Sequence, residues 1–102
     1  MNKPARAIKQ FQKAAELLPD VADYYNGGGY SLFHLSRFNE AIDEFNKALS
    51  LNPANIDAIA GLGIAYVKVG NKDQAMDAYS KLKDRNKETA DKLLEIIKRA
   101  SL

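Results

Sequence analysis

Apolar residues recur along the chain at steps of three and four positions, the spacing that gives a helix one buried face. In the first stretch with this spacing the apolar positions are Ala7, Ile8, Phe11, Ala14, Ala15 and Leu18. No segment alternates apolar and polar residues with a period of two for long enough to suggest a strand. The pattern therefore predicts an all-α protein of about six helices, at residues 4–18, 21–35, 38–51, 55–69, 72–85 and 88–101.

Proline and glycine mark several of the predicted helix ends. Pro19 and Pro53 each stop the helix before them, because proline disfavours the α conformation at the preceding residue. Gly70-Asn71 indicates a turn between two helices. Since all the connections are short, neighbouring helices should run antiparallel.

The helices repeat with a period of 34 residues. Phe11, Phe45 and Tyr79 follow one another at this interval. Five further columns keep the same step with similar size and polarity: Ala7, Ala41 and Ala75; Ile8, Ile42 and Met76; Ala14, Ala48 and Leu82; Pro19 and Pro53; Gly29 and Gly63. Such self-similarity is typical of repeat proteins, in which one helix pair buries its apolar face only by stacking on its neighbours.

A helix–turn–helix unit of this length with these columns resembles the tetratricopeptide repeat. The unit at 22–55 matches best, through Tyr25, Gly29, Leu32, Phe38-Asn39-Glu40-Ala41-Ile42, Phe45, Ala48 and Pro53. The unit at 56–89 follows with Ile59, Leu62, Gly63, Tyr66, Gly70, Ala75, Tyr79 and Leu82, and departs from the family at Lys87, where the family has proline. The resemblance implies a right-handed superhelical stack of antiparallel helix pairs.

The 102 residues equal three repeat lengths, but the repeat boundaries are offset from the two ends of the sequence by roughly one helix. We expect a single domain in which 4–21 supply the second helix of a partial repeat, 22–55 and 56–89 are repeats, and 90–102 form a C-terminal capping helix. The two terminal helices are complementary in type. Copies of the chain are therefore an alternative partner for each other, head to tail or as a swapped dimer, with candidate contacts at Phe11, Leu93 and Ile97.

In the tetratricopeptide family, the first helix of each repeat lines a concave face on which partner peptides or helices bind. The matching positions here are Asp23, Asn26, Tyr30, Phe33, His34, Asp57, Ala60, Ile64, Val67 and Lys68. The apolar members suit apolar side chains of a partner, and the aspartates suit basic ones. One subfamily clamps a C-terminal carboxylate with basic inner-face residues. Its matching positions here, Asn26, Gly27, Tyr30, Asp57, Gly61 and Ile64, include no basic residue, so the resemblance does not extend to that activity.

Composition narrows the classes of function. The chain has no cysteine and one histidine, which excludes a disulfide framework or thiol chemistry and leaves few ligands for a transition metal. The net charge of +2 does not indicate the basic patch of a nucleic-acid binder. No apolar stretch is long enough for a membrane span or a signal peptide, so we expect a cytoplasmic protein without membrane contact. His34 has no catalytic companion, so we expect no enzyme activity, no cofactor and no metal.

These inferences together predict a protein-interaction scaffold. Its concave groove is expected to bind a peptide or helix of a protein partner that carries apolar and basic side chains. Self-association through the terminal helices remains the alternative.

Overall fold

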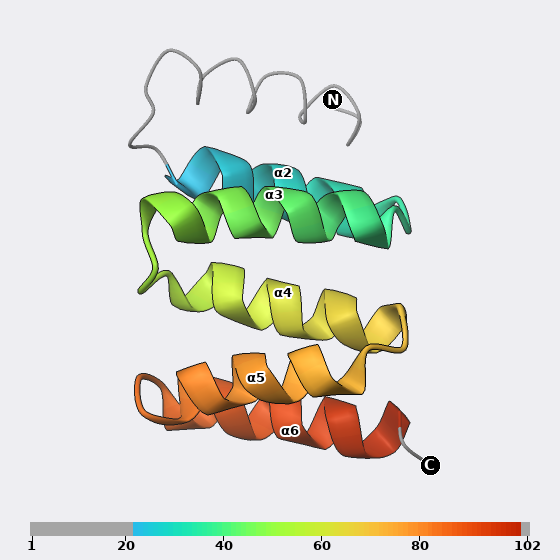
Figure 1. The fold of residues 1–102 in the computed structure, drawn as a ribbon, viewed down its shortest axis with the longest axis vertical. Coiled ribbons are helices and arrows are strands. Elements are labelled where there is room, and N and C mark those ends of the chain that lie inside the picture. The colour runs from blue at the N-terminus through green and yellow to red at the C-terminus, as the bar shows by residue number, and fades with distance from the viewer. Residues whose placement is uncertain (1–21, 101–102) are drawn as a thin grey trace.

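The computed structural model describes residues 22–100, which form five helices (Figure 1). They are α2 (Ala22–His34), α3 (Phe38–Leu51), α4 (Ile56–Lys68), α5 (Lys72–Lys83) and α6 (Lys87–Ala100). None of these described residues lies in a strand. The all-α prediction is confirmed, and each observed helix begins and ends within two residues of its predicted bounds. The helix predicted at 4–18, with Phe11, lies outside the described residues.

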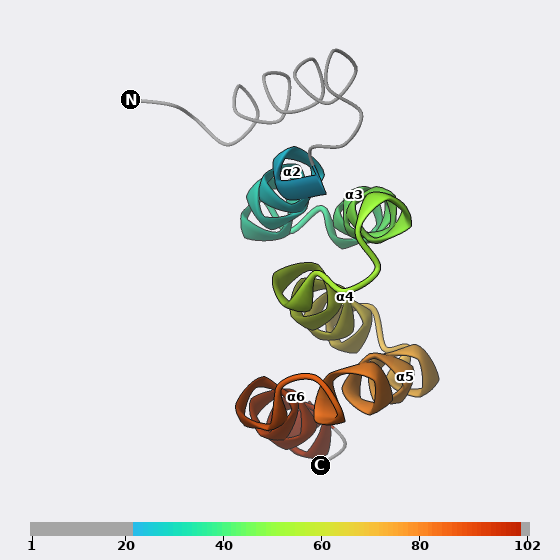
Figure 2. The same cartoon turned by 90° about the vertical axis from the view of Figure 1, so that its left-hand side faces the viewer.

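The helices stack in two columns, with α2, α4 and α6 in one and α3 and α5 in the other (Figure 2). Each helix packs on the next one along the chain. In the first column α2 also contacts α4, and α4 contacts α6, whereas α3 and α5 make no direct backbone contact. The stack is therefore tighter on the side of α2, α4 and α6. That side is the concave face, and the side of α3 and α5 is the convex face.

Phe45 on α3 is the centre of the first part of the core. Its side chain is completely buried, and its ring lies between the backbones of α2 and α4. A Cβ atom built on Gly29 would lie 2.7 Å from the ring, and one built on Gly61 would lie 2.5 Å from it. Glycine therefore suits both positions, because the ring occupies the space that a side chain would need.

The second part of the core lies where α6 closes the stack. Leu93 and Ile97 of α6 are each 2% exposed and pack with Ile59 of α4 and Leu82 of α5. A Cβ atom on Gly63 would lie 2.6 Å from a methyl carbon of Leu93, so α6 approaches the α4 backbone closely. The helix predicted as a cap thus supplies two of the largest fully enclosed side chains.

Asparagine side chains begin three of the helices. Asn55, Asn71 and Asn86 each accept a hydrogen bond from the backbone N–H three residues later, at 3.1, 3.2 and 3.0 Å. These bonds satisfy backbone donors that have no partner within the helix, which explains where the helices start. All three caps are short-range signals, which is one reason that the sequence places the helix starts so closely.

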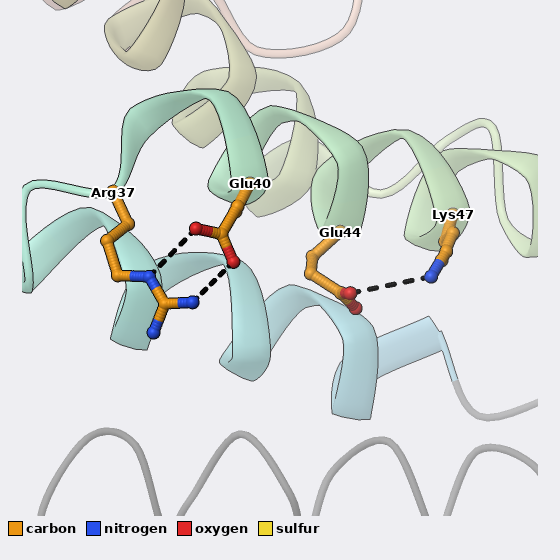
Figure 3. Close-up of polar contacts among 4 residues, drawn as sticks. All are labelled: Arg37, Glu40, Glu44 and Lys47. Atoms are coloured by element: carbon orange, nitrogen blue, oxygen red, sulfur yellow. Dashed lines mark hydrogen bonds and ion pairs between the residues drawn. The ribbon is translucent and has the colours of Figure 1, made fainter.

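The start of α3 is different, because Arg37 at its N-cap position makes no capping bond with its side chain. Its guanidinium group instead pairs in a bidentate manner with Glu40, with a distance of 2.9 Å from Nε to Oε1 (Figure 3). One turn further, Lys47 pairs with the buried Glu44 at 3.5 Å. Lys47 also lies 5.7 Å from the centre of the Tyr25 ring on α2, so it joins the two helices of this pair.

Candidate functional site

The first half of the predicted groove lies along α2. The five positions Asp23, Asn26, Tyr30, Phe33 and His34 follow the three-and-four spacing of one helix face. Asp23 and His34, at the two ends of the helix, are exposed, and the three residues between them are half-buried. This face therefore keeps part of its apolar surface open after the helix has packed on α3 and α4.

The second half lies along α4 and repeats the first. Asp57 and Lys68 are exposed at the ends of the helix, while Ala60, Ile64 and Val67 between them are half-buried. The structure thus places all ten predicted groove residues on helices of the concave column. Both rows have acidic residues near the helix N-terminus and His34 or Lys68 near the C-terminus, an order that also suits the helix dipole.

A hydrogen bond joins the two rows. The hydroxyl group of Tyr30 donates to the backbone oxygen of Asp57 at 2.8 Å. The Tyr30 ring meets Phe45 edge to face, with 5.0 Å between the ring centres. Burial raises the pKa of Tyr30, and the negative charge of Asp57 raises it further. Tyr30 therefore remains a neutral donor held in one position, and its ring rather than its hydroxyl group is available to a partner.

A weaker polar contact lies at the N-terminal end of the groove. The amide nitrogen of Asn55 lies 3.4 Å from a carboxylate oxygen of Asp23, which links the start of α2 to the cap of α4. One turn further along α2, Oδ1 of Asn26 is buried and makes no hydrogen bond with the described residues. An amide oxygen without a partner is uncommon and costs free energy. Asn26 is thus the polar residue of the groove whose bonding is incomplete.

Aromatic side chains gather at the opposite end of the groove. The Phe33 ring contacts the Phe38 ring of α3 edge to face, with 5.2 Å between the ring centres. The exposed His34 ring also contacts Phe33 edge to face, with 6.1 Å between the centres. Phe33 is therefore held by its neighbours while remaining half-exposed. It offers a rigid apolar surface at this end.

The structure adds three positions on α6 that the sequence analysis missed. Asp91, Leu94 and Lys98 follow Asp57, Ala60 and Ile64 by one repeat length, and α6 stands beside α4 in the concave column. Leu94 is half-buried, and the other two residues are exposed. The 34-residue step would have found them had it been extended to the last helix. They continue the groove across a third helix and add a third aspartate at its N-terminal end.

Of the three predicted self-association contacts, two lie in the core of the described residues. Phe11 lies outside the described residues. Leu93 and Ile97 are each 2% exposed and pack inside their own chain with core residues of α4 and α5. The open side of α6 instead presents Ile96, half-buried among Lys92, Glu95 and Arg99.

Residues 22–100 lack two further features, a candidate metal site and a candidate membrane span. That range contains no group of three or more histidine, aspartate or glutamate side chains arranged to hold a metal ion. Nor does any helix in it combine the length and the apolar character needed to cross a membrane.

Comparisons with known proteins identify the fold. The crystal structure of MamA is similar with a TM-score of 0.76 and 26% sequence identity, over 95% of this chain and 66% of the MamA chain. The chain thus spans just under two thirds of the length of that relative. Among curated protein sequences, none matches. Two family models of the tetratricopeptide repeat match residues 32–94 and 1–56, each more than half of the chain, and the protein therefore belongs to the tetratricopeptide repeat family.

Proposed function

We propose that the concave face of α2, α4 and α6 binds an extended or helical segment of a protein partner that carries apolar and basic side chains. Membership of the tetratricopeptide family supports a protein-interaction scaffold in general. The observation that supports this finer proposal is the double row of half-buried apolar residues. Tyr30 and Phe33 on α2, and Ile64 and Val67 on α4, remain partly open after the chain has packed.

The charges at one end of the groove define the partner further. Asp23, Asp57 and Asp91 are all exposed near the N-termini of the three concave helices. Removing part of the water around an exposed carboxylate costs little free energy. Such carboxylates attract cations over about 8 Å at physiological salt. Basic side chains of a partner would therefore be steered to this end, and its apolar side chains would contact the rows beyond it.

Peptide selection on the intact chain tests this proposal. Random peptides displayed on phage should enrich sequences that combine apolar and basic residues. Asp57→Asn should weaken the selected peptides several-fold and reduce the salt dependence of binding, because it removes one charge while keeping the backbone oxygen that Tyr30 uses. Ile64→Ala should weaken them about tenfold through lost apolar contact.

The matched control is Lys83→Gln on α5, an exposed residue on the other column of helices. It should leave the affinity unchanged, and circular dichroism should show the same helix content in all variants. Equal binding of the selected apolar and basic peptides by Asp57→Asn, Ile64→Ala and the parent chain would count against the concave groove.

Self-association is the alternative function expected from the sequence. Burial of Leu93 and Ile97 leaves Ile96 as the apolar side chain on the open side of α6, with charged neighbours around it. Two of those neighbours, Glu95 and Arg99, already pair with each other at 2.9 Å. Sedimentation equilibrium at increasing protein concentration tests self-association through α6. An increase in mass that Ile96→Glu abolishes supports it, and a constant monomer mass argues against it.

A further inference from the structure

The convex face contains a cleft that the proposed concave groove does not use. In Figure 2, α3 and α5 form the column opposite the concave helices, and they make no direct backbone contact with each other. Leu49 and Pro53 on the α3 side, Ile59 of α4, and Lys81 and Arg85 on the α5 side line a cavity of about 310 Å³ there. A smaller cavity of about 70 Å³ shares Leu49, Ile59 and Lys81 with it.

The floor of this cleft is apolar and well ordered by packing. Ile59 is 1% exposed because it belongs to the core shared by α4, α5 and α6. Leu49 is half-buried on one wall, and the exposed Pro53 extends that wall beyond the end of α3. A large apolar side chain entering the cleft would contact Leu49 and Pro53, with the buried Ile59 beneath them.

The opposite wall of the cleft is basic. Lys81 and Arg85 are four positions apart along α5 and the turn that follows it, and both are exposed. Lys81 pairs with Asp77 at 3.3 Å, but both side chains are more than half exposed, and such pairs are worth little. Arg85 makes no ion pair within residues 22–100, and its backbone N–H is held by the oxygen of Leu82 at 2.9 Å. Arg85 therefore stands beside an apolar floor without an acidic partner among residues 22–100, while Lys81 shares its charge with Asp77.

We propose that this cleft is a second docking site, which takes an acidic protein segment with one large apolar side chain against Leu49 and Pro53, above Ile59, and a neighbouring carboxylate against Lys81 and Arg85. Charge complementarity decides the occupant. The other polar side chains of the lining are the neutral Asn46, Tyr66 and Gln74 and the acidic Asp77, which pairs with Lys81. Lys81 and Arg85 against the single carboxylate leave the mouth of the cleft near Pro53 and Arg85 with a net positive charge. The scaffold would thus hold partners of opposite charge on its two faces.

Nuclear magnetic resonance of the intact, isotope-labelled chain tests the cleft with two synthetic peptides. The probe is acetyl-Glu-Leu-Glu-Glu-amide, and its neutral counterpart is acetyl-Gln-Leu-Gln-Gln-amide. The acidic peptide should cause saturable shifts at Leu49, Ile59 and Arg85, and the neutral peptide should bind about tenfold more weakly. Arg85→Gln should weaken the acidic peptide at least several-fold, because the charged partner of the carboxylate is lost.

Arg99→Gln is the matched control, since Arg99 is an exposed arginine near the end of α6 that does not line the cleft. It should leave the affinity for the acidic peptide unchanged. The proposal is overturned if both peptides bind equally, if no shifts occur at Leu49 and Ile59, or if the shifts centre on Tyr30 and Ile64. A concentration-dependent mass that Arg85→Gln abolishes would overturn it as well, because the occupant would then be a second copy of the chain.

Discussion

At the scale of single residues, the ring of Phe45 joins three helices. It fills the space above Gly29 of α2 and Gly61 of α4, and it supports the ring of Tyr30 at the groove. The side chain that shapes the core is therefore also the one that positions a groove residue. Substitutions around Phe45 should change both stability and the geometry of the concave face.

Gly61→Ala tests the close packing on this ring. Alanine is favoured over glycine in a helix by about 1 kcal/mol, but its Cβ would lie 2.5 Å from Cζ of Phe45. Overpacking of a core costs about 1–3 kcal/mol, so we expect a net loss of stability in urea unfolding. Adding Phe45→Leu to Gly61→Ala should make the alanine less costly than it is beside the full ring. A rise in the urea midpoint of Gly61→Ala alone would show that the Phe45 ring moves aside without a loss of stability.

Tyr30→Phe isolates the hydroxyl group that joins α2 to α4. The ring stays, but the bond to the Asp57 oxygen is lost, which should lower the unfolding free energy by about 1 kcal/mol. Because folding raises the pKa of Tyr30 above 10.0, the folded state favours the neutral phenol. That contribution is complete below pH 10.0 and is lost as pH rises through the higher pKa of the folded state. The difference between parent and variant in urea unfolding should therefore shrink in strongly alkaline solution; a constant difference would argue against the assigned bond.

At the scale of helices, the two turns that close the helix pairs share one geometry. After α2, Arg37 N–H bonds to the oxygen of Leu32 and Ser36 has a φ of 61°. After α4, Asn71 N–H bonds to the oxygen of Tyr66 and Gly70 has a φ of 80°. Both turns are Schellman motifs, in which a left-handed residue ends the helix. Glycine suits this conformation, whereas serine is strained in it.

Ser36→Gly and Gly70→Ala form a matched pair at these turns. Ser36→Gly should raise the unfolding free energy by about 1 kcal/mol by relieving the left-handed strain, and Gly70→Ala should lower it by a similar amount. A Cβ atom on Gly70 would have no neighbour within 4 Å, so the loss would come from the backbone alone. Thermal melts of both variants measure this, and changes of the same sign in the two would refute the shared geometry.

At the scale of the whole molecule, the stack depends on the contacts of each helix with its neighbours, as repeat proteins do. α6 is part of the core and does not merely cover it, because its Leu93 and Ile97 complete the second part of the core. Its outer side carries the exposed ion pairs Glu88–Lys92 and Glu95–Arg99. One helix thus buries an apolar face against α4 and α5 and turns charged residues to solvent.

Ile97→Ala and Ile96→Ala compare these two sides of α6. Ile97 is 2% exposed, so its truncation should cost about 2–4 kcal/mol of unfolding free energy through the cavity that it leaves. Ile96 is half-buried on the outer side, and its truncation should cost less than about 1 kcal/mol. Urea unfolding followed by circular dichroism measures both. Equal losses would mean that the outer side of α6 is also packed in solution.

Much of this protein was determined by its sequence alone. The 34-residue step, the three-and-four spacing of apolar residues and the prolines and glycines located the helices to within two residues, since these signals act over short distances. The resemblance to the tetratricopeptide family assigned the ten groove residues to the first helices of the repeats, which lie in one column. The 34-residue step would have added Asp91, Leu94 and Lys98, because a repeat transfers positions from one unit to the next.

The tertiary structure decided what depends on contacts between distant segments. Gly61 is small because Phe45 of another helix fills its space, and Leu93 and Ile97 are core residues because α4 and α5 cover them. The bond from Tyr30 to Asp57 and the cleft between α3 and α5 also need the packed stack. Periodicity shows which face of a helix is apolar, but the neighbouring helices determine which apolar residues remain open to a partner.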